Sequence, residues 1–416
     1  MDTPFIYNGY VTDKNFIGRA TERKILANLI KAGEHVSIYE PPKTGKMSLL
    51  MQVFSDLKNE RTQFVVAMVD MLNVRTLEDF LMKFGTAVIK LSASTPDDYA
   101  SIVETYLDGT HFVFDRVQFI NTGQVLSLNW KPDENDIAEL MMLPQKLALA
   151  KGMRYVVVLN EFQNLMNADE YETVFKIMET QMKERDRKAP YQAVFVMMGG
   201  MVNAMKLIFD EKRYFYRQVN RVALSNVDTK EIIEYVVKGF LSGMGKSFDR
   251  NLAMGACELF KSNLWYINHL AAICDALSKG FVTETMMTDA LESMISVHQI
   301  RFMSIVNDLT DHQLSLLRAV LDGAALFSCV IYLTTQSAVT QKNQEVTALK
   351  SELSLLMDTN SATRERINDA IDLEYVREYA TEVLGMVYPT ESQIVTYKSS
   401  DDDYVKQYQD IPQSGD

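Results

Sequence analysis

The sequence predicts an α/β fold in which a parallel sheet is followed by a helical region and then by one long helix. Three observations support this prediction. Apolar runs at 36–39, 64–69 and 154–159 alternate with amphipathic helical patterns, as expected of a sheet that helices cover on both faces. Beyond Asp228 the apolar residues recur only at helical spacing. From Val339 onward the apolar period becomes seven, which is typical of a coiled coil.

The composition is that of a globular protein with about two to three domains. The chain has 416 residues, of which 47% are hydrophobic and 23% charged, and its formal net charge is −13. This negative charge argues against nucleic acid as the main partner. Cys257, Cys274 and Cys329 are far apart and the histidines show no ligand spacing, so we expect free thiols and no structural metal.

The opening elements follow from local patterns. Residues 1–15 are predicted to be an N-terminal arm, and 20–32 an amphipathic helix. The β-rich run 36–39 then enters a turn that contains prolines and a glycine. Apolar residues at three- and four-residue spacing predict the helix that follows; they are Leu49, Leu50, Val53, Phe54 and Leu57.

This strand, loop and helix have the layout of a phosphate-binding P-loop. In the consensus G-x-x-x-x-G-K-S/T, loop amides cradle phosphates, the lysine binds their oxygens, and the last hydroxyl binds Mg²⁺. The chain reads E-P-P-K-T-G-K-M and retains Gly45 and Lys46, preceded by Thr44. We therefore predict that these three residues contribute to a nucleotide site.

Two positions of the consensus are replaced. Glu40 stands where the first glycine belongs, and a carboxylate there opposes anion binding. Met47 stands where the hydroxyl belongs, and a thioether is a poor ligand for a hard cation. Ser48 follows, but one residue along a helix turns a side chain by about 100°. We expect Met47 and Ser48 at the site, with a weakened metal position.

A second polar position follows the apolar run 154–159. Such a run is typical of a strand buried on both faces of a parallel sheet. A Walker B strand has this form and ends in Asp, which holds Mg²⁺, and Glu, which orients the attacking water. Here Asn160 replaces the Asp and is a degenerate metal position, whereas Glu161 is retained as a candidate catalytic residue. Because Asn160 and Met47 weaken the same function independently, a degenerate nucleotide site is favoured over chance similarity.

A flanking motif makes a family resemblance specific. The segment F-I-G-R-A-T-E-R-K-I-L at 16–26 contains Gly18 and Arg19. It resembles the box that opens archaeal-type and STAND-like AAA ATPases. In that group the box lies beside the adenine pocket, so the resemblance implies that Gly18 and Arg19 help to bind nucleotide.

A downstream motif extends this resemblance. After another apolar strand at 192–198, Tyr216-Arg217 resembles the arginine that this ATPase group uses to sense phosphate. Arg217 is therefore a second candidate catalytic residue. The resemblance covers about residues 10–230 and implies a P-loop NTPase domain at 1–227.

The resemblance also organises the following segments. Residues 94–144 are irregular and are predicted to form an insertion with helices and a hairpin. The helical patterns at 228–307 resemble the helical lid of AAA proteins, and we expect Trp265 and Tyr266 to serve there in packing. By the same resemblance, 308–323 is the first helix of a truncated winged-helix module.

An apolar segment at 324–335 is too short to cross a membrane alone. Extended back to Leu314 it includes Arg318 and Asp322, whose insertion cost offsets the apolar gain. The sequence thus leaves a membrane span undecided. We expect a cytoplasmic protein, with membrane association through 314–335 as the open alternative.

Residues 336–372 carry heptad repeats with an apolar seam. The seam consists of Val346, Leu349, Leu353 and Leu356. Asn360 occupies an a position, where a polar residue fixes the register at some cost in stability. We expect this segment to pair with itself or with another coiled-coil protein.

The C-terminal segment carries a second resemblance. The string A-x-x-x-L-G-M-V-Y-P-x-x-x-Q-I within 373–398 resembles the small motif that ends cell-division proteins of the septum-formation-initiator type. Such proteins combine a membrane span, a coiled coil and this motif. The tail 399–416 is rich in Asp and is predicted to be disordered. Both resembled modules are incomplete near Gly323, and a natural fusion and a recombination chimera both stay open.

Three functional hypotheses follow. The first is a degenerate AAA-like protein that binds ATP or another nucleotide weakly, without a requirement for Mg²⁺ and with little hydrolysis. In it Lys46 would contact phosphates, Glu161 would orient water and Arg217 would sense the γ-phosphate. The second is a non-catalytic coiled-coil scaffold or membrane-associated division-type protein. The third is an active ATPase that uses Ser48 or a partner's residue instead.

Overall fold

The computed structural model describes residues 4–211, 214–370 and 372–390, and the side chains of 244, 324–341, 343 and 367–370 lie outside this description. The chain forms two compact units, Met1–Ser304 and Ile305–Asp416. The tail 399–416 and the end of the predicted C-terminal motif lie outside the described residues.

A five-stranded parallel sheet forms the centre of the first unit. Its strands are β1 (His35–Tyr39), β2 (Phe64–Asp70), β5 (Arg154–Asn160), β6 (Ala193–Gly199) and β7 (Val219–Arg221). They are arranged in the order β2-β5-β6-β1-β7, with every neighbouring pair parallel. The predicted α/β fold with a parallel sheet is confirmed, and the apolar runs of the sequence are its strands.

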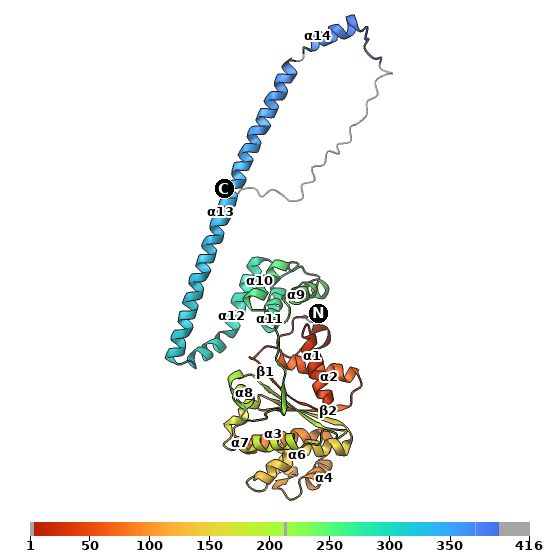
Figure 1. Cartoon of the computed structure of the whole chain (residues 1–416), viewed down its shortest axis with the longest axis vertical. Helices are drawn as coiled ribbons and strands as arrows, with labels where there is room; N and C mark the ends of the chain where they lie inside the picture. The colour runs from red at the N-terminus through yellow and green to blue at the C-terminus, as the bar shows by residue number, and fades with distance from the viewer. Residues whose placement is uncertain (1–3, 212–213, 371, 391–416) are drawn as a thin grey trace. The chain divides into compact units, whose positions relative to one another are not determined.

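Helices cover both faces of this sheet (Figure 1). One face carries α1 (Ala20–Ala32) and α2 (Lys46–Asn59), and the other carries α3 (Leu77–Ser92), α6 (Glu134–Lys151) and α7 (Tyr171–Glu184). Successive residues of β5 enter the two cores in turn, as the pleat of a strand requires. Each large apolar side chain that is fully buried there contributes roughly 1.5–3 kcal/mol.

The predicted insertion is a small helical subdomain with a hairpin. Its elements are α4 (Pro96–Tyr106), β3 (Phe112–Val113), α5 (Arg116–Thr122) and β4 (Ser127–Leu128). Strands β3 and β4 pair antiparallel, so the predicted hairpin is confirmed. Two further short helices follow strands of the sheet along the chain: η2 (Phe162–Asn167) comes after β5 and α8 (Val202–Phe209) after β6.

The helices after β7 enclose a core of their own. They are α9 (Thr229–Met244), α10 (Arg250–Leu259), α11 (Leu264–Leu277) and α12 (Glu284–Asn307). The N-terminal arm, with η1 (Asp13–Asn15) at its end, is tied to this region because Phe5 is buried in the helical core. Gly239 of α9 makes room for that ring, since a Cβ there would lie 2.7 Å from Phe5 Cζ. The arm therefore packs on these helices, which we name the lid after the prediction, as well as on the sheet domain.

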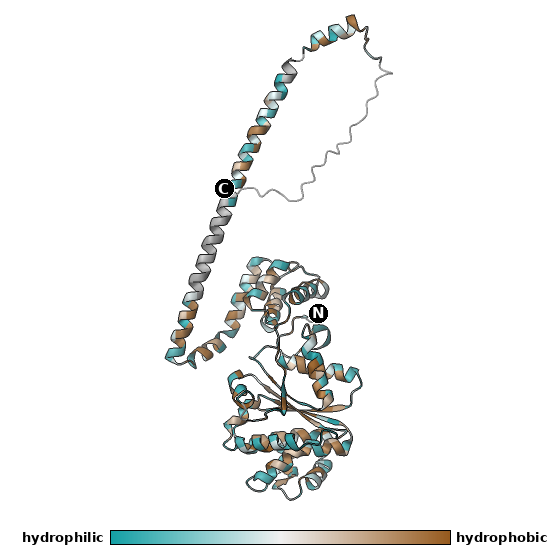
Figure 2. Ribbon diagram, viewed as in Figure 1, coloured by the Kyte–Doolittle hydropathy of each residue, from teal (hydrophilic) through white to brown (hydrophobic). Residues whose placement is uncertain are grey.

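The second unit is dominated by α13 (Asp311–Ala370), followed by α14 (Leu373–Glu378) and the π-helical turn Tyr379–Val383. The segments predicted at 308–323, 324–335 and 336–372 fall largely within this one helix of 60 residues. Apolar residues recur along the described part of α13 (Figure 2). Those of the predicted seam are 49% to 60% exposed: Val346, Leu349, Leu353 and Leu356.

None of the described helices combines the length and the apolar character that crossing a membrane requires. The side chains of 324–335 lie outside the described ones. Membrane association through 314–335 therefore stays a prediction.

Candidate functional site

A cavity of about 770 Å³ lies at the carboxyl ends of β1, β5 and β6. This edge of a parallel sheet is where open α/β folds bind ligands. Most of the lining comes from the N-terminal arm, the loop between β1 and α2, the segment after β7, and the start of α11 with the residues before it. The predicted residues that line it are Arg19, Thr44, Gly45, Lys46, Met47, Ser48, Asn160 and Glu161.

The loop between β1 and α2 wraps around the Lys46 ammonium. Lys46 Nζ donates to the carbonyl of Glu40 at 2.6 Å and to that of Pro41 at 3.0 Å. Gly45 precedes the helix with φ of 85°, a conformation that favours glycine. Burial lowers the pKa of Lys46, and the carboxylates of Glu161 and Glu40 oppose this shift. The lysine is thus held inside the loop by neutral oxygens that a phosphate could replace.

Arg19 brings a second cation to the same loop. Its Nη2 donates to the carbonyl of Thr44 at 2.6 Å, and its Nε is buried without a hydrogen-bond partner among the described residues. A Cβ at Gly45 would lie 3.3 Å from Arg19 Nη1, so the glycine allows this approach. Gly18 does not line the cavity; it packs against Val227 instead.

The two positions that the sequence predicts for a metal ion hold groups that do not fit Mg²⁺. Met47 lines the cavity and packs against the core under α2. Asn160 offers a neutral amide, whose Nδ2 donates to Asp70 Oδ1 at 3.4 Å. Ser48 Oγ accepts the backbone N–H of Val11 at 3.1 Å, so this hydroxyl holds the N-terminal arm. A thioether and a neutral amide are weak partners for a small hard cation.

Glu161 points to the end of β6. Its Oε2 accepts hydrogen bonds from Gln163 Nε2 at 2.7 Å and from the backbone N–H of Gly200 at 3.0 Å. Its backbone is left-handed, with φ of 55°. A Cβ at Gly200 would lie 3.2 Å from Glu161 Oε1, a tight contact that would displace the carboxylate slightly. The carboxylate lines the cavity but is held by two donors.

The carboxylate of Glu40 is directed toward β7. Its Oε1 lies 3.4 Å from the backbone N–H of Leu224, which donates to it, and 3.9 Å from Arg221 Nη2. The repulsion that the Glu40 carboxylate would exert on a bound anion is therefore partly offset by the positive charge of Arg221. Arg221 is itself stacked on Tyr39, with its guanidinium carbon 4.2 Å from the ring centroid.

Arg217 lies outside the cavity lining. It is exposed in the segment before β7, and its guanidinium carbon lies 5.1 Å from the centroid of the Tyr216 ring. The structure does not bring it together with the other predicted site residues. Its role as a phosphate sensor stays a prediction.

Sequence reasoning missed the contact between the loop and the lid. Lys43 Nζ lies 3.0 Å from the centroid of the Trp265 ring and 5.8 Å from that of Tyr266. Both aromatic residues pack as expected, yet both also line the cavity. Lys43 occupies a variable position of the P-loop pattern, so no motif singled it out.

A group with metal-ligand chemistry lies in the insertion and consists of His111, Asp133 and Asp136. Its oxygens have other partners: Asp136 accepts the backbone N–H groups of His111 and Asp133 at 2.7 and 2.8 Å. Asp133 in return accepts the N–H of Asp136 at 2.9 Å, which completes a capping box at the start of α6. These bonds explain the group as a helix cap.

The structure is similar to solved ATPases. It matches the Walker-type ATPase of Pyrococcus abyssi with a TM-score of 0.50 and 12% identity, over 73% of this chain and 79% of that one. The Aeropyrum pernix ORC2 protein matches with a TM-score of 0.47 and 12% identity, over 70% of each chain. The Thermotoga maritima RuvB Holliday junction branch migration motor matches at 0.34 and 12%, over 70% of this chain and 73% of that one. The first match confirms the predicted P-loop ATPase fold, and at this identity it shows the fold alone.

Residues 323–407 match the family model described as septum formation initiator, DivIC. This match confirms the resemblance that the C-terminal motif indicated. No curated protein sequence matches the chain.

Proposed function

We propose that the first unit binds ATP or another nucleoside polyphosphate in this cavity, with little dependence on Mg²⁺ and little hydrolysis. One observation carries the proposal: a P-loop cavity is lined by four cations, while its two predicted metal positions hold Met47 and Asn160. The cations are Arg19, Lys43, Lys46 and Lys261. The charge that a polyphosphate requires is thus supplied by the protein, while the ligands that Mg²⁺ requires are replaced.

The loop and the first turn of α2 suit a phosphate group. The N-terminus of a helix presents free N–H groups and the positive end of its dipole to an anion. Lys46 would exchange its bonds to the carbonyls of Glu40 and Pro41 for bonds to phosphate oxygens. A bond from the ammonium to an anionic phosphate oxygen joins two opposite charges and is stronger than its bond to a neutral carbonyl, so the exchange favours binding.

The remaining chemistry of the site favours slow hydrolysis. When Mg²⁺ is present in such a site, it neutralises charge that develops on the phosphates. The carboxylate of Glu161 is turned toward Gln163 and Gly200, which both donate to its Oε2, so only Oε1 is left to orient a water molecule. Ser48 already holds Val11 through its hydroxyl oxygen, which weakens the case for a compensated active ATPase.

Equilibrium dialysis of the full chain with labelled ATP tests this proposal, together with a single-turnover assay of the bound fraction in Mg²⁺. We expect saturable binding at one site per chain and a turnover no faster than that of the same chain carrying Glu161→Gln. Absence of saturable binding would contradict nucleotide binding. Rapid turnover that depends on Glu161 would instead support the active-ATPase hypothesis.

A second function is favoured by the exposed seam of α13. Leu349, Leu353 and Leu356 lie at heptad spacing and are each more than half exposed. The septum formation initiator match begins within the same helix. We propose that α13 pairs with a second copy of itself or with another coiled-coil chain. Sedimentation equilibrium of the full chain distinguishes the two, because only self-pairing produces a dimer from this chain alone.

A further inference from the structure

Lys43 adopts an unusual position for a residue of a phosphate loop. Its backbone is left-handed, with φ of 66°, and its side chain extends to the lid rather than into the loop. The Trp265 ring under its ammonium is fixed, because Nε1 donates to the carbonyl of Tyr7 at 2.7 Å. Lys43 is therefore a cation of the phosphate loop that contacts the lid directly.

Lys43 makes no ion pair with a carboxylate among the described residues. Burial lowers the pKa of its ammonium to about 8, the Arg301 guanidinium acts in the same direction, and no carboxylate among the described residues offsets them. The neighbouring groups are His269 and His298. Burial is the largest cause that lowers the pKa of each of these histidines, and the charge of Lys43 lowers both further. An ammonium that lies on an aromatic face with a guanidinium nearby would gain from a nearby anion.

The cavity offers that anion a place within reach. Lys43, Lys46 and Arg19 all line it, and the first two belong to the same short loop. A bound triphosphate carries several negative charges, which Lys46 and Arg19 alone leave partly uncompensated. Because Met47 and Asn160 are poor metal ligands, a further protein cation near the phosphate chain would favour binding. Two other cations line the cavity, Lys43 in the loop and the exposed Lys261.

We propose that Lys43 is a second phosphate-binding lysine, which leaves the face of Trp265 when nucleotide binds and takes over part of the charge compensation that a metal would supply. This inference rests on the proposed nucleotide binding. The same movement would release a contact between the loop and the lid, so occupancy of the cavity would be transmitted to α11.

Tryptophan fluorescence tests the movement. The chain has two tryptophans, and Trp130 is exposed, so Trp130→Phe leaves Trp265 as the single reporter. In this background and in EDTA, ATP should change the emission of Trp265 along a saturable curve. Lys43→Met should change the emission before any ATP is added and should remove most of the ATP-induced change. No ATP-induced change at a concentration that saturates binding would overturn the proposal.

Affinity supplies the second readout. Lys43→Met should weaken ATP binding about tenfold, as expected for loss of one charge-assisted contact, and should weaken AMP binding much less. Lys43→Arg should retain most of the ATP affinity, and Lys24→Met, on the exposed side of α1, should leave it unchanged. If the substitution weakened the binding of ATP and of AMP equally, Lys43 would have only a structural role in positioning the lid, and its phosphate role would be overturned. If the parent chain binds no ATP at all, both the proposed function and this inference fail. If the Lys43→Met chain binds ATP with the affinity of the parent chain, only this inference fails.

Discussion

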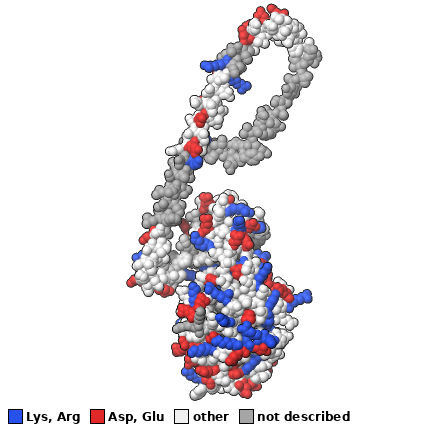
Figure 3. Space-filling view, viewed as in Figure 1, with Lys and Arg blue, Asp and Glu red and all other residues white. Residues whose placement is uncertain are grey.

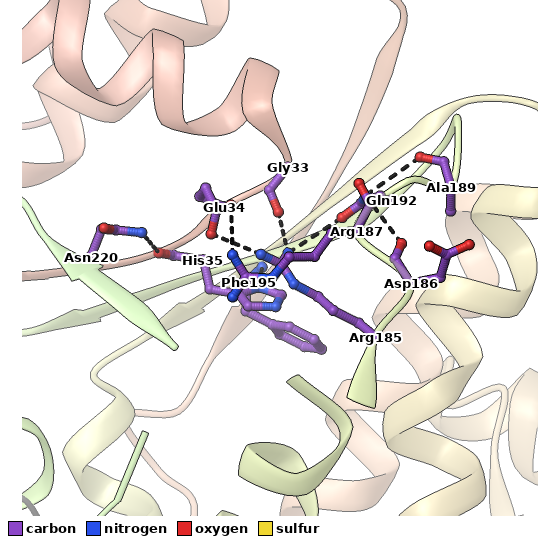
Figure 4. A network of polar contacts seen from close by, with 10 residues as sticks. All are labelled: Gly33, Glu34, His35, Arg185, Asp186, Arg187, Ala189, Gln192, Phe195 and Asn220. Carbon is purple, nitrogen blue, oxygen red and sulfur yellow. Dashed lines mark hydrogen bonds and ion pairs between the residues drawn. The ribbon is translucent and has the colours of Figure 1, made fainter. Parts of the chain in front are cut away.

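The cations at the two ends of β1 have different hydrogen-bond partners; we call the N-terminal end of the strand its first end and the C-terminal end its last end. At the first end, Arg185 donates to the carbonyl of Gly33, to Glu34 Oε2 at 2.7 Å and to Gln192 Oε1 at 3.3 Å (Figure 4). This cation has a carboxylate partner. At the last end, Lys46 and Arg19 donate only to backbone carbonyls in the described structure.

This difference separates a structural network from a binding site. A cation that is paired with a carboxylate and packed between strands gains nothing from a ligand. A cation that is held by neutral oxygens next to a cavity can exchange them for an anion. On the face shown in Figure 3, basic and acidic side chains are otherwise interspersed over the first unit, so the cations of the cavity are defined by their partners rather than by a large basic surface.

The largest expected effect is at the last end of β1. Lys46→Ala should lower ATP affinity at least about 100-fold, because it removes charge-assisted bonds to phosphate. The melting temperature should change little, since Lys46 makes no ion pair among the described residues. Calorimetric titration and thermal unfolding of the same sample measure both. Retained affinity would show that the loop is not the phosphate site.

The next effect is at the first end and concerns pH. His35 is buried, its Nδ1 accepts the N–H of Phe195 at 3.1 Å, and burial followed by the charges of Arg185 and Arg187 lowers its pKa to about 3. The unfolded chain binds the proton near pH 6.5, so the stability that this group provides is complete above that pH. It is lost as the pH falls from 6.5 toward 3. Between pH 7 and 5 the loss should be about 2 kcal/mol.

His35→Asn isolates this term, because an amide can accept the same N–H but does not titrate. Urea unfolding at pH 7 and 5 should show a smaller acid-induced loss for the variant than for the parent chain, while ATP affinity at pH 7 stays the same. Parallel pH profiles for the two chains would mean that His35 is not held neutral.

A smaller effect should come from restoring the metal positions. Met47→Thr and Asn160→Asp each supply one ligand for the same ion, so their effects on Mg²⁺-dependent hydrolysis should be non-additive, with a coupling of about 1–2 kcal/mol. A double-mutant cycle on the hydrolysis rate measures this. Purely additive effects would indicate that the two side chains do not share an ion.

Substitutions in α13 should have the smallest effect on ATP affinity and on the stability of the first unit. Leu353→Ser combined with Leu356→Ser should abolish pairing of the helix, whereas Asn360→Leu should strengthen it. Neither change should alter ATP affinity or unfolding of the first unit by more than about 0.5 kcal/mol. Circular dichroism and sedimentation over a hundredfold concentration range test the pairing. Concentration-independent helicity of the parent chain would contradict self-association.

Much of the fold could be predicted because it depends on local pattern. Helix α1 begins and ends where the amphipathic pattern does, at Ala20 and Ala32, and β5 coincides with an apolar run that is buried on both faces. The continuity of α13 was not predicted, because the apolar segment and the heptads were assigned to different modules. No helix-breaking residue separates them, and one helix satisfies the backbone throughout.

Of the candidate site, only the residues at fixed positions of known motifs could be predicted from the sequence. Lys46 and Asn160 stand at fixed positions of known patterns and do line one cavity. The contact of Lys43 with Trp265 joins segments that are distant in the chain and depends on the lid's packing. The bonds of Glu161 to Gln163 and Gly200 likewise depend on a left-handed backbone and a rotamer that sequence does not specify.

The most direct test of the central claim is ATP affinity measured with Mg²⁺ and with EDTA. If Arg19, Lys43 and Lys46 supply the charge and Met47 and Asn160 hold no effective metal, the dissociation constant should change by less than about threefold on chelation. A loss of affinity of tenfold or more in EDTA would contradict the account, because it would show that a metal ion carries the binding.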